Sequence, residues 1–326
     1  MSDEVALVVD DAGHGATIAA IVRGAMNVPW SRARQLCRDG RVTLDGTLAR
    51  DDAARVRRGQ RVIVRPTAPR VREVAGELSR DRIVHLDGEL VVVDKPAGLQ
   101  SVPFTDEDHD SLAQRTTMLL RRLEGKRLPP VRVVQRLDKD TSGLVVFART
   151  KSAERALAQQ LRTHAMHRRY HALAYGAVQP GTMRSLLLDD RGDGLRGSFR
   201  GPDHRAPSGA REAVTIVELE RHVEIDGVLC SWITCRLQTG RTHQIRIHLS
   251  ESGHPLVGEH VYIRGFDEPP LRWPAGFEPR TLLHAAELGF VHPASGEEIR
   301  FERPEPPDFA AWRAASATRS APRSTR

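Results

Sequence analysis

The chain has 326 residues, of which 40% are hydrophobic, and its 49 basic and 42 acidic residues give a formal net charge of +7. This length suits one large domain with a smaller one, and the sequence lacks the apolar run of about 18 residues that a membrane-spanning helix needs. The acidic first residues predict no secretory signal, and the odd number of cysteines, three, indicates free thiols, so we expect a cytoplasmic protein. We also expect it to be a monomer.

Arginine supplies almost all of the positive charge, because only four of the 49 basic residues are lysines and 45 are arginines. Arginine binds phosphate through two parallel hydrogen bonds and stacks on bases, so this composition indicates a nucleic-acid partner. A GC-rich genome would produce the same composition, but the position of the charge is informative. Thirteen arginines and only four aspartates lie between Arg23 and Arg72, which makes this segment a candidate RNA-binding surface.

The basic segment has the pattern of a small folded unit. Ser31 is expected to cap a helix that Gly40 ends. The buried face of this helix is expected to consist of Ala33, Leu36 and Cys37. Asp45 and Gly46 then predict a hairpin turn, and a second strand follows at residues 61–66.

The order of serine, arginine, glycine and valine in residues 15–66 resembles the αL RNA-binding domain. This domain occurs in a small-subunit ribosomal protein, in tyrosyl-tRNA synthetases and in several RNA-modifying enzymes. The resemblance implies a domain that binds the backbone of folded RNA. The residues implied for RNA binding are Ser31, Arg32, Arg34, Arg38 and Arg41. The alternative is a solvated basic surface on an interaction module.

The pattern changes after residues 67–80, which lack an apolar period and are predicted to be a linker. Two apolar runs divided by Asp87-Gly88 predict a hairpin of two strands. Residues 152–165 have helical spacing, and residues 213–237 read as strands. A further helix is expected within residues 241–253, since a glycine and then a proline end the apolar period there. Strands and helices do not alternate as in a doubly wound sheet, so the predicted fold class is α+β.

The segment between two apolar runs contains most of the candidate catalytic residues. Residues 131–147 read VRVVQRLDKDTSGLVVF, in which Asp138 follows the first run and Gly143 allows a tight turn before the second. A carboxylate presented in this way can act as a nucleophile, a general base or a metal ligand. We predict no metal site, and the sequence has no glycine-rich phosphate loop or dinucleotide fingerprint.

One alternative comes from the spacing of the acids in this segment. Asp138-x-Asp140-x-Ser142 resembles the loop of haloacid-dehalogenase-type phosphatases in which the first aspartate is phosphorylated. Such loops follow an unbroken apolar strand of a doubly wound sheet. Here residues 135–137 interrupt the strand, so an aspartate-dependent phosphatase is the less favoured hypothesis.

The string Arg136–Leu144 closely resembles the signature of the RluA family of RNA pseudouridine synthases. Further blocks match the family in order, at residues 92–98, 169–170, 239–246 and 283–306. The resemblance implies a mostly antiparallel central sheet flanked by helices, and an enzyme that isomerises specific uridines in structured RNA without a cofactor. We expect large-subunit ribosomal RNA of the 23S type as the substrate, with transfer RNA as the other candidate.

The resemblance also implies roles for single residues. Asp138 corresponds to the catalytic aspartate, Tyr170 to the tyrosine that stacks on the substrate base, and Arg241 to the arginine that pairs with the aspartate. The residues from Lys139 to Gly143 are expected to hold the loop. Gln135 departs from the histidine that is usual in the family. The presence of the aspartate, tyrosine and arginine favours an enzyme over a non-catalytic RNA-binding or ribosome-assembly factor on the same fold.

These patterns together predict a domain organisation. The predicted parts are an αL-type domain at 15–66, a linker at 67–80, a catalytic domain at 81–312 and a disordered basic tail at 313–326. The tail is small, polar and basic, a composition that cannot bury enough apolar surface to fold alone.

Overall fold

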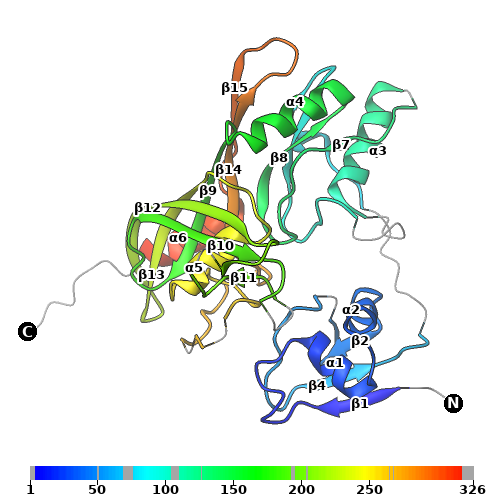
Figure 1. The fold of residues 1–326 in the computed structure, drawn as a ribbon, viewed down its shortest axis with the longest axis vertical. Coiled ribbons are helices and arrows are strands. Elements are labelled where there is room, and N and C mark those ends of the chain that lie inside the picture. Colours follow the sequence, from blue (N-terminus) through cyan, green and yellow to red (C-terminus); the bar gives the residue numbers. More distant parts are fainter. Residues whose placement is uncertain are drawn as a thin grey trace, which may run out of the picture. The chain divides into compact units, whose positions relative to one another are not determined.

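The computed structural model of the chain describes residues 4–49, 51–68, 76–103, 110–125, 127–191, 195–202, 205–263, 265–266 and 268–317 (Figure 1). The chain divides into two compact units. The first unit is Met1–Glu73 with His260–Gly265, and the second is Val74–Glu259 with Phe266–Arg326.

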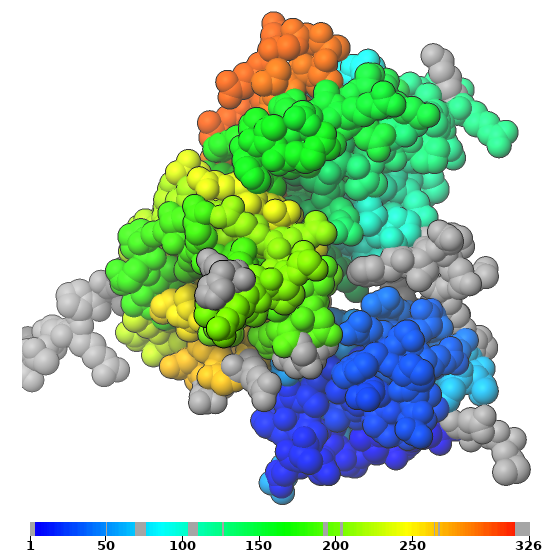
Figure 2. All heavy atoms as spheres, in the orientation of Figure 1, coloured from blue at the N-terminus to red at the C-terminus, as the bar shows by residue number. Residues whose placement is uncertain are grey.

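The first unit is a four-stranded antiparallel sheet, in the order β1-β4-β2-β3, with two helices. Its elements are β1 (Val5–Val8), α1 (Ile18–Met26), α2 (Trp30–Arg38), β2 (Val42–Leu44), β3 (Thr47–Leu48) and β4 (Arg61–Val64). Because β1 pairs with β4, the unit begins before residue 15, the start predicted from the sequence. The blue atoms of Figure 2 show this unit as one packed body.

Two local predictions for the first unit are confirmed and one is wrong. Ala33, Leu36 and Cys37 are fully buried in its core, and Asp45 and Gly46 have the positive φ angles of a tight hairpin turn. Ser31, however, does not cap α2. The helix begins at Trp30, after Pro29, and has no side-chain cap, so Ser31 lies exposed in its first turn.

The second unit is built on an eleven-stranded sheet with the strand order β11-β10-β12-β13-β9-β14-β8-β6-β5, in which β15 pairs with β14 and β7 with β8. The strands are β5 (Ile83–Leu86), β6 (Leu90–Lys95), β7 (Arg132–Val133), β8 (Ser142–Ala148), β9 (His167–Tyr175), β10 (Gly181–Leu188), β11 (Gly197–Ser198), β12 (Arg211–Ile225), β13 (Val228–Leu237), β14 (Leu283–Val291) and β15 (Glu298–Glu302). Among these, β14 and β8 pair in parallel, and the other strand pairs are antiparallel. The predicted α+β class is therefore confirmed, and the doubly wound sheet that the phosphatase hypothesis needs is not the fold.

Helices cover both faces of this sheet near β6 and β8, whose residues are all buried. The helices of the second unit are α3 (Leu112–Glu124), α4 (Lys151–Arg162), α5 (Gln244–Glu251) and α6 (Pro307–Ala317), with a short 3₁₀ helix, η1 (Arg80–Arg82). The alternate residues Val145 and Phe147 pack in the core that includes α3, whereas Leu144 and Val146 pack in the core that includes α4. A strand covered on both faces needs a continuous apolar run, which explains the sequence LVVFA.

The C-terminal segment corrects one prediction. Residues 313–317, assigned to a disordered tail by composition, form the last part of α6. Trp312 and Phe309 on this helix are buried in a core that also contains Trp232 of β13, and this burial stabilises the helix. The rest of the predicted tail, 318–326, lies outside the described residues, as do positions 69–75 of the predicted linker. Within the described part of the chain, no helix has the length and apolar character needed to cross a bilayer.

Candidate active site

The Asp138 loop, residues 134–141, lies between β7 and β8 and presents a partly exposed carboxylate, with 21% of the Asp138 side chain accessible. Four consecutive carbonyl oxygens of this loop each accept a hydrogen bond. The donors are Ser101 Oγ to Leu137 (2.7 Å), Thr141 N to Asp138 (3.2 Å), Lys95 Nζ to Lys139 (2.7 Å) and Arg280 Nη1 to Asp140 (3.0 Å). The backbone on both sides of Asp138 is therefore fixed largely by residues remote in sequence.

Lys95 is the most deeply buried of these donors. Its side chain is inaccessible to solvent, and its ammonium group also donates to the carbonyls of Pro96 (2.9 Å) and Leu99 (2.6 Å). Burial lowers the pKa of Lys95 to about 7, against the opposing effect of the negative charges of Asp140 and Asp138. The lysine thus joins the turn after β6 to the Asp138 loop and is not placed to contact a phosphate.

Gly143 has a role that differs from the predicted tight turn. Its φ angle is 108°, and a Cβ atom at this position would lie 2.2 Å from the carbonyl oxygen of Ala285. The parallel pairing of β8 with β14 therefore requires glycine here.

Strand register explains how distant residues meet beside Asp138. Gly143 is the partner of Ala285 in the β8–β14 pair, and Ala285 is the partner of Tyr170 in the β14–β9 pair. Tyr170 therefore lies two strands from the start of β8, at the level of the Asp138 loop. Its side chain packs in the same core as Leu137 and Ile245 and is 7% exposed.

The Tyr170 phenol remains protonated over the physiological pH range. Burial raises its pKa, the charge of Asp138 adds to this effect, and Arg168 opposes it. The effect of the Asp138 charge on the phenol places Tyr170 near the Asp138 loop, with a neutral ring.

The charged partner of Asp138 is Arg246 and not Arg241. Arg246 Nη1 lies 3.7 Å from Asp138 Oδ2, and His243 Nε2 lies 3.9 Å from Asp138 Oδ1. Arg246 also forms two hydrogen bonds of 2.7 Å with the carboxylate of Glu259, which is fully buried. The predicted pairing of Arg241 is wrong in this structure, because its Nε donates to the carbonyl of Glu212 (2.9 Å).

The backbone conformation around His243 explains why the partner of Asp138 is Arg246, five positions after the predicted Arg241. His243 adopts the left-handed conformation (φ 58°) immediately before α5, so the helix begins at Gln244 and Arg241 lies before its first turn. Gln244 is buried and bonds Thr239 Oγ1 (2.7 Å) and the carbonyl of Val214 (3.0 Å), which fixes the helix start on β12. His243 and Arg246 are three residues apart and reach the same carboxylate.

His243 and Arg246 differ in their charge near neutral pH. Burial lowers the pKa of His243, and the charges of Arg246 and Arg196 lower it further, while Asp138 and Glu259 oppose these effects. The imidazole is therefore neutral at pH 7, and Arg246 supplies the positive charge beside Asp138.

The structure gives Gln135 no role that we can assign.

The five residues predicted to bind RNA lie on or next to α2, in different environments. Ser31 and Arg32 are exposed. Arg34 lies over the ring of Trp30, 5.6 Å from its centroid, and Arg23 lies 5.0 Å from the same ring. Two of the five are bound within the unit: Arg38 pairs with Asp52 at 3.0 Å, and Arg41 donates to the carbonyl of Pro66 at 2.7 Å.

Metal ligation has no support in the part of the chain that the structure describes, where no three histidine, cysteine or acidic side chains are grouped to hold an ion. The two histidines on one face of β9 each bond a carboxylate instead. His167 bonds Glu287 at 2.8 Å, and His171 bonds Glu305 at 2.8 Å.

Comparison with known families and sequences gives consistent matches. The sequence profile described as "RNA pseudouridylate synthase" matches residues 89–251. "Ribosomal large subunit pseudouridine synthase D" of Xanthomonas campestris pv. campestris is 33% identical over 311 residues, which are 93% of this chain and 89% of that protein. The protein of the same name from Pseudomonas aeruginosa is 33% identical over 293 residues, 86% of this chain and 85% of its own.

Solved structures support the fold. "Human RNA Pseudouridylate Synthase Domain Containing 4" superposes with a TM-score of 0.56 at 23% identity and covers 73% of this chain and 93% of its own. "Human RNA Pseudouridylate Synthase Domain Containing 1" gives a TM-score of 0.52 at 24% identity, covering 71% of this chain and 87% of its own.

Proposed function

Because the chain belongs to the RluA family of RNA pseudouridine synthases and so isomerises uridine to pseudouridine in RNA, we propose that its substrate is large-subunit ribosomal RNA and that Asp138 is the catalytic carboxylate. The names of the relatives support the substrate. One observation supports the catalytic role above all others: the partly exposed Asp138 carboxylate lies within 4 Å of the guanidinium of Arg246 and near the ring of Tyr170.

The chemistry defines what these residues have to do. The C1′–N1 bond of the uridine breaks, a C1′–C5 bond forms, and the hydrogen on C5 is replaced while N1 gains one, so the reaction balances without an oxidant or water. A carboxylate can stabilise or trap the electrophilic C1′, as carboxylates do in retaining glycosidases. The cationic Arg246 would orient the Asp138 carboxylate toward the sugar.

The substrate base has to leave the RNA stack to reach such a site. The ring of Tyr170 would then pack on the extruded uracil, because a neutral aromatic face stacks on any base. Arg136, exposed and two residues before Asp138, is placed to contact RNA beside the extruded nucleotide.

The experiment that tests this function uses the native protein with unmodified transcripts of large-subunit ribosomal RNA and of transfer RNA. We expect pseudouridine at a few defined uridines of the ribosomal transcript, detected by chemical mapping at nucleotide resolution. Pseudouridine in the transfer RNA alone would refute the proposed substrate. RNA binding without any pseudouridine would instead favour an RNA-binding or ribosome-assembly factor.

We also propose that the first unit binds RNA backbone through the surface of α2. Removing two positive charges there should weaken binding and flatten its dependence on salt, since each neutralised phosphate adds about 0.7–0.9 to the slope of log K against log salt. Arg32, which is exposed, and Arg34, which lies over the Trp30 ring, are the residues to replace, because changing Arg38 or Arg41 would also remove the bonds to Asp52 and Pro66.

The expected result for Arg32→Gln/Arg34→Gln is a slope reduced by about 1–2 in filter-binding titrations. The double variant Arg155→Gln/Arg162→Gln on α4 of the other unit is the charge-matched control. An equal slope change in both double variants would mean that net charge, and not the α2 surface, produces the effect.

A further inference from the structure

Arg280 connects the Asp138 loop to the C-terminal helix. Its guanidinium is buried and donates through Nη1 to the carbonyl of Asp140 at 3.0 Å. The same group forms two hydrogen bonds with Asp308, from Nε to Oδ2 at 2.5 Å and from Nη2 to Oδ1 at 3.0 Å. Asp308 lies in the first turn of α6. One arginine therefore joins the backbone two residues beyond the proposed catalytic carboxylate to the start of α6.

The remaining contacts of Arg280 fix its position. Nη1 also lies within hydrogen-bond distance of the carbonyls of Thr281 (3.2 Å) and Leu283 (3.4 Å), just before and at the start of β14. The guanidinium lies over the ring of Phe309, 5.4 Å from its centroid. A planar guanidinium with donors in a fixed fork and partners on several sides has little freedom to turn.

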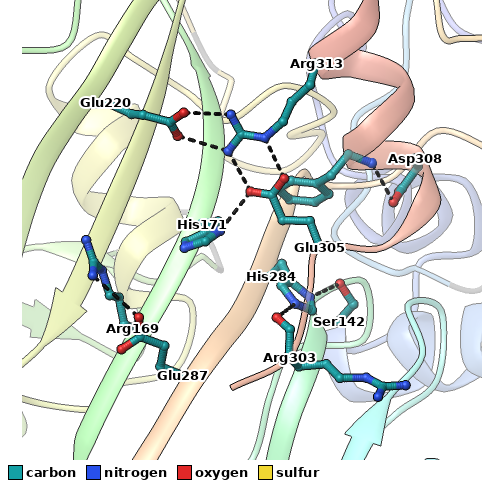
Figure 3. A network of polar contacts seen from close by, with 11 residues as sticks. Ser142, Arg169, His171, Glu220, His284, Glu287, Arg303, Glu305, Asp308 and Arg313 are labelled. Carbon is teal, nitrogen blue, oxygen red and sulfur yellow. Dashed lines mark hydrogen bonds and ion pairs between the residues drawn. The ribbon is translucent and has the colours of Figure 1, made fainter. Parts of the chain in front are cut away.

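The segment before α6 makes a second connection to the same region. Ser142, the first residue of β8, bonds His284 Nδ1 at 3.0 Å, and His284 Nε2 lies 3.2 Å from the carbonyl of Arg303. The Arg303 side chain in turn donates to Asp94, next to Lys95, at 2.7 Å. Figure 3 shows Ser142, His284 and Arg303 together with Asp308. The C-terminal segment thus contacts Asp94, next to Lys95, and His284, which bonds Ser142 just after the Asp138 loop.

We propose that Arg280, held by Asp308 of α6, is a positioning residue that fixes the Asp138 carboxylate for catalysis. This inference rests on the proposed role of Asp138. Three donors come from outside the loop. Ser101 and Lys95 lie before it in sequence, whereas Arg280 lies after it and bonds its C-terminal part at Asp140. Without Arg280, the Asp140 carbonyl would lose its donor and the loop would be free to move relative to Arg246 and Tyr170.

A displacement of this kind affects the rate more than the binding. Catalytic groups have to lie within a fraction of an ångström of the productive geometry, and a displacement of about 1 Å can lower the rate about 100-fold. RNA binding, by contrast, depends mostly on phosphate contacts spread over a large surface. The signature of a positioning role is therefore a lower kcat with an unchanged KM.

The test variant is Arg280→Met/Asp308→Leu, which replaces the buried ion pair by an apolar pair, an exchange that often preserves stability. The matched control is Arg149→Met/Glu124→Leu. Arg149 also joins a carboxylate, Glu124 at 2.6 Å, to a backbone carbonyl, that of Asp87, but it lies at the other end of β8. Single-turnover rates, KM, Tm and hydrogen exchange of the peptide that covers residues 134–143 are measured for both.

We expect the test variant to lose about 100-fold in kcat with KM within about twofold, and to exchange faster within residues 134–143 than the native protein. We expect the control to keep its kcat within about threefold. A test-variant kcat within that range, or an equal loss in the control, would overturn the inference.

Two further measurements cover a double variant that does not fold and a native protein that is inactive. If the double variant does not fold, Arg280→Lys is measured in its place, because lysine keeps the positive charge but lacks the planar guanidinium that bonds several acceptors at once. Arg149→Lys is then the matched control. If the native protein makes no pseudouridine, the proposed function is refuted, and hydrogen exchange alone then decides whether Arg280 fixes the loop.

Discussion

Replacing Asp138 with asparagine should abolish pseudouridine formation, with a loss of about 10⁴-fold or more in single-turnover rate, as is typical when a group that acts on the reacting atoms is removed. Asparagine has nearly the same shape as aspartate but cannot stabilise or trap a positive C1′. The backbone hydrogen bonds that fix the loop involve carbonyls and not the Asp138 carboxylate. The fold and the Tm should therefore be preserved.

The matched control for this substitution is Asp140→Asn. Asp140 lies in the same loop, is also partly exposed, and contributes its backbone carbonyl, not its carboxylate, to the bond with Arg280. We expect its rate to stay within about tenfold of the native rate. RNA affinity should be unchanged in both variants, as measured by filter binding. Pseudouridine formation by Asp138→Asn at more than a few per cent of the native rate would refute the proposed mechanism.

The sequence revealed the parts of the site that lie in contiguous motifs. Asp138 follows an apolar run, and Tyr170 lies in the next long strand after a helix. The strand register places Tyr170 level with Gly143, at the start of β8 and just after the Asp138 loop. The α+β class followed from the irregular order of strands and helices. Helix α3 was not predicted, although Ser111 caps it and its buried face has helical spacing.

What holds the Asp138 loop could not be predicted from the sequence. The residues from Lys139 to Gly143 were expected to hold it, but Ser101, Lys95 and Arg280 provide most of the donors. A buried lysine and a buried arginine reach the loop only because β6, β8 and β14 are neighbours in the sheet. Such contacts depend on strand order, and local spacing does not determine strand order.

The identity of the arginine beside Asp138 gives the second large prediction. Lysine keeps the positive charge at position 246 but cannot bond both oxygens of Glu259 while it reaches Asp138. We therefore expect Arg246→Lys to lower the single-turnover rate about 10²- to 10³-fold, the usual effect of removing one preorganised donor. Arg241→Lys should stay within about threefold of the native rate, because its side chain bonds a carbonyl of β12.

The lysine variants also distinguish the catalytic effect from a loss of stability. Glu259 is fully buried, so a neutral residue at position 246 would remove the two hydrogen bonds that Arg246 donates to this carboxylate, at a cost of about 3–5 kcal/mol. Lysine avoids most of this cost, and rates measured well below the Tm of each variant report the chemical step. If Arg241→Lys lost as much activity as Arg246→Lys, Arg241 would have to turn toward Asp138 when RNA binds. The opposite result would mean that the start of α5 at Gln244 selects Arg246 as the partner of Asp138.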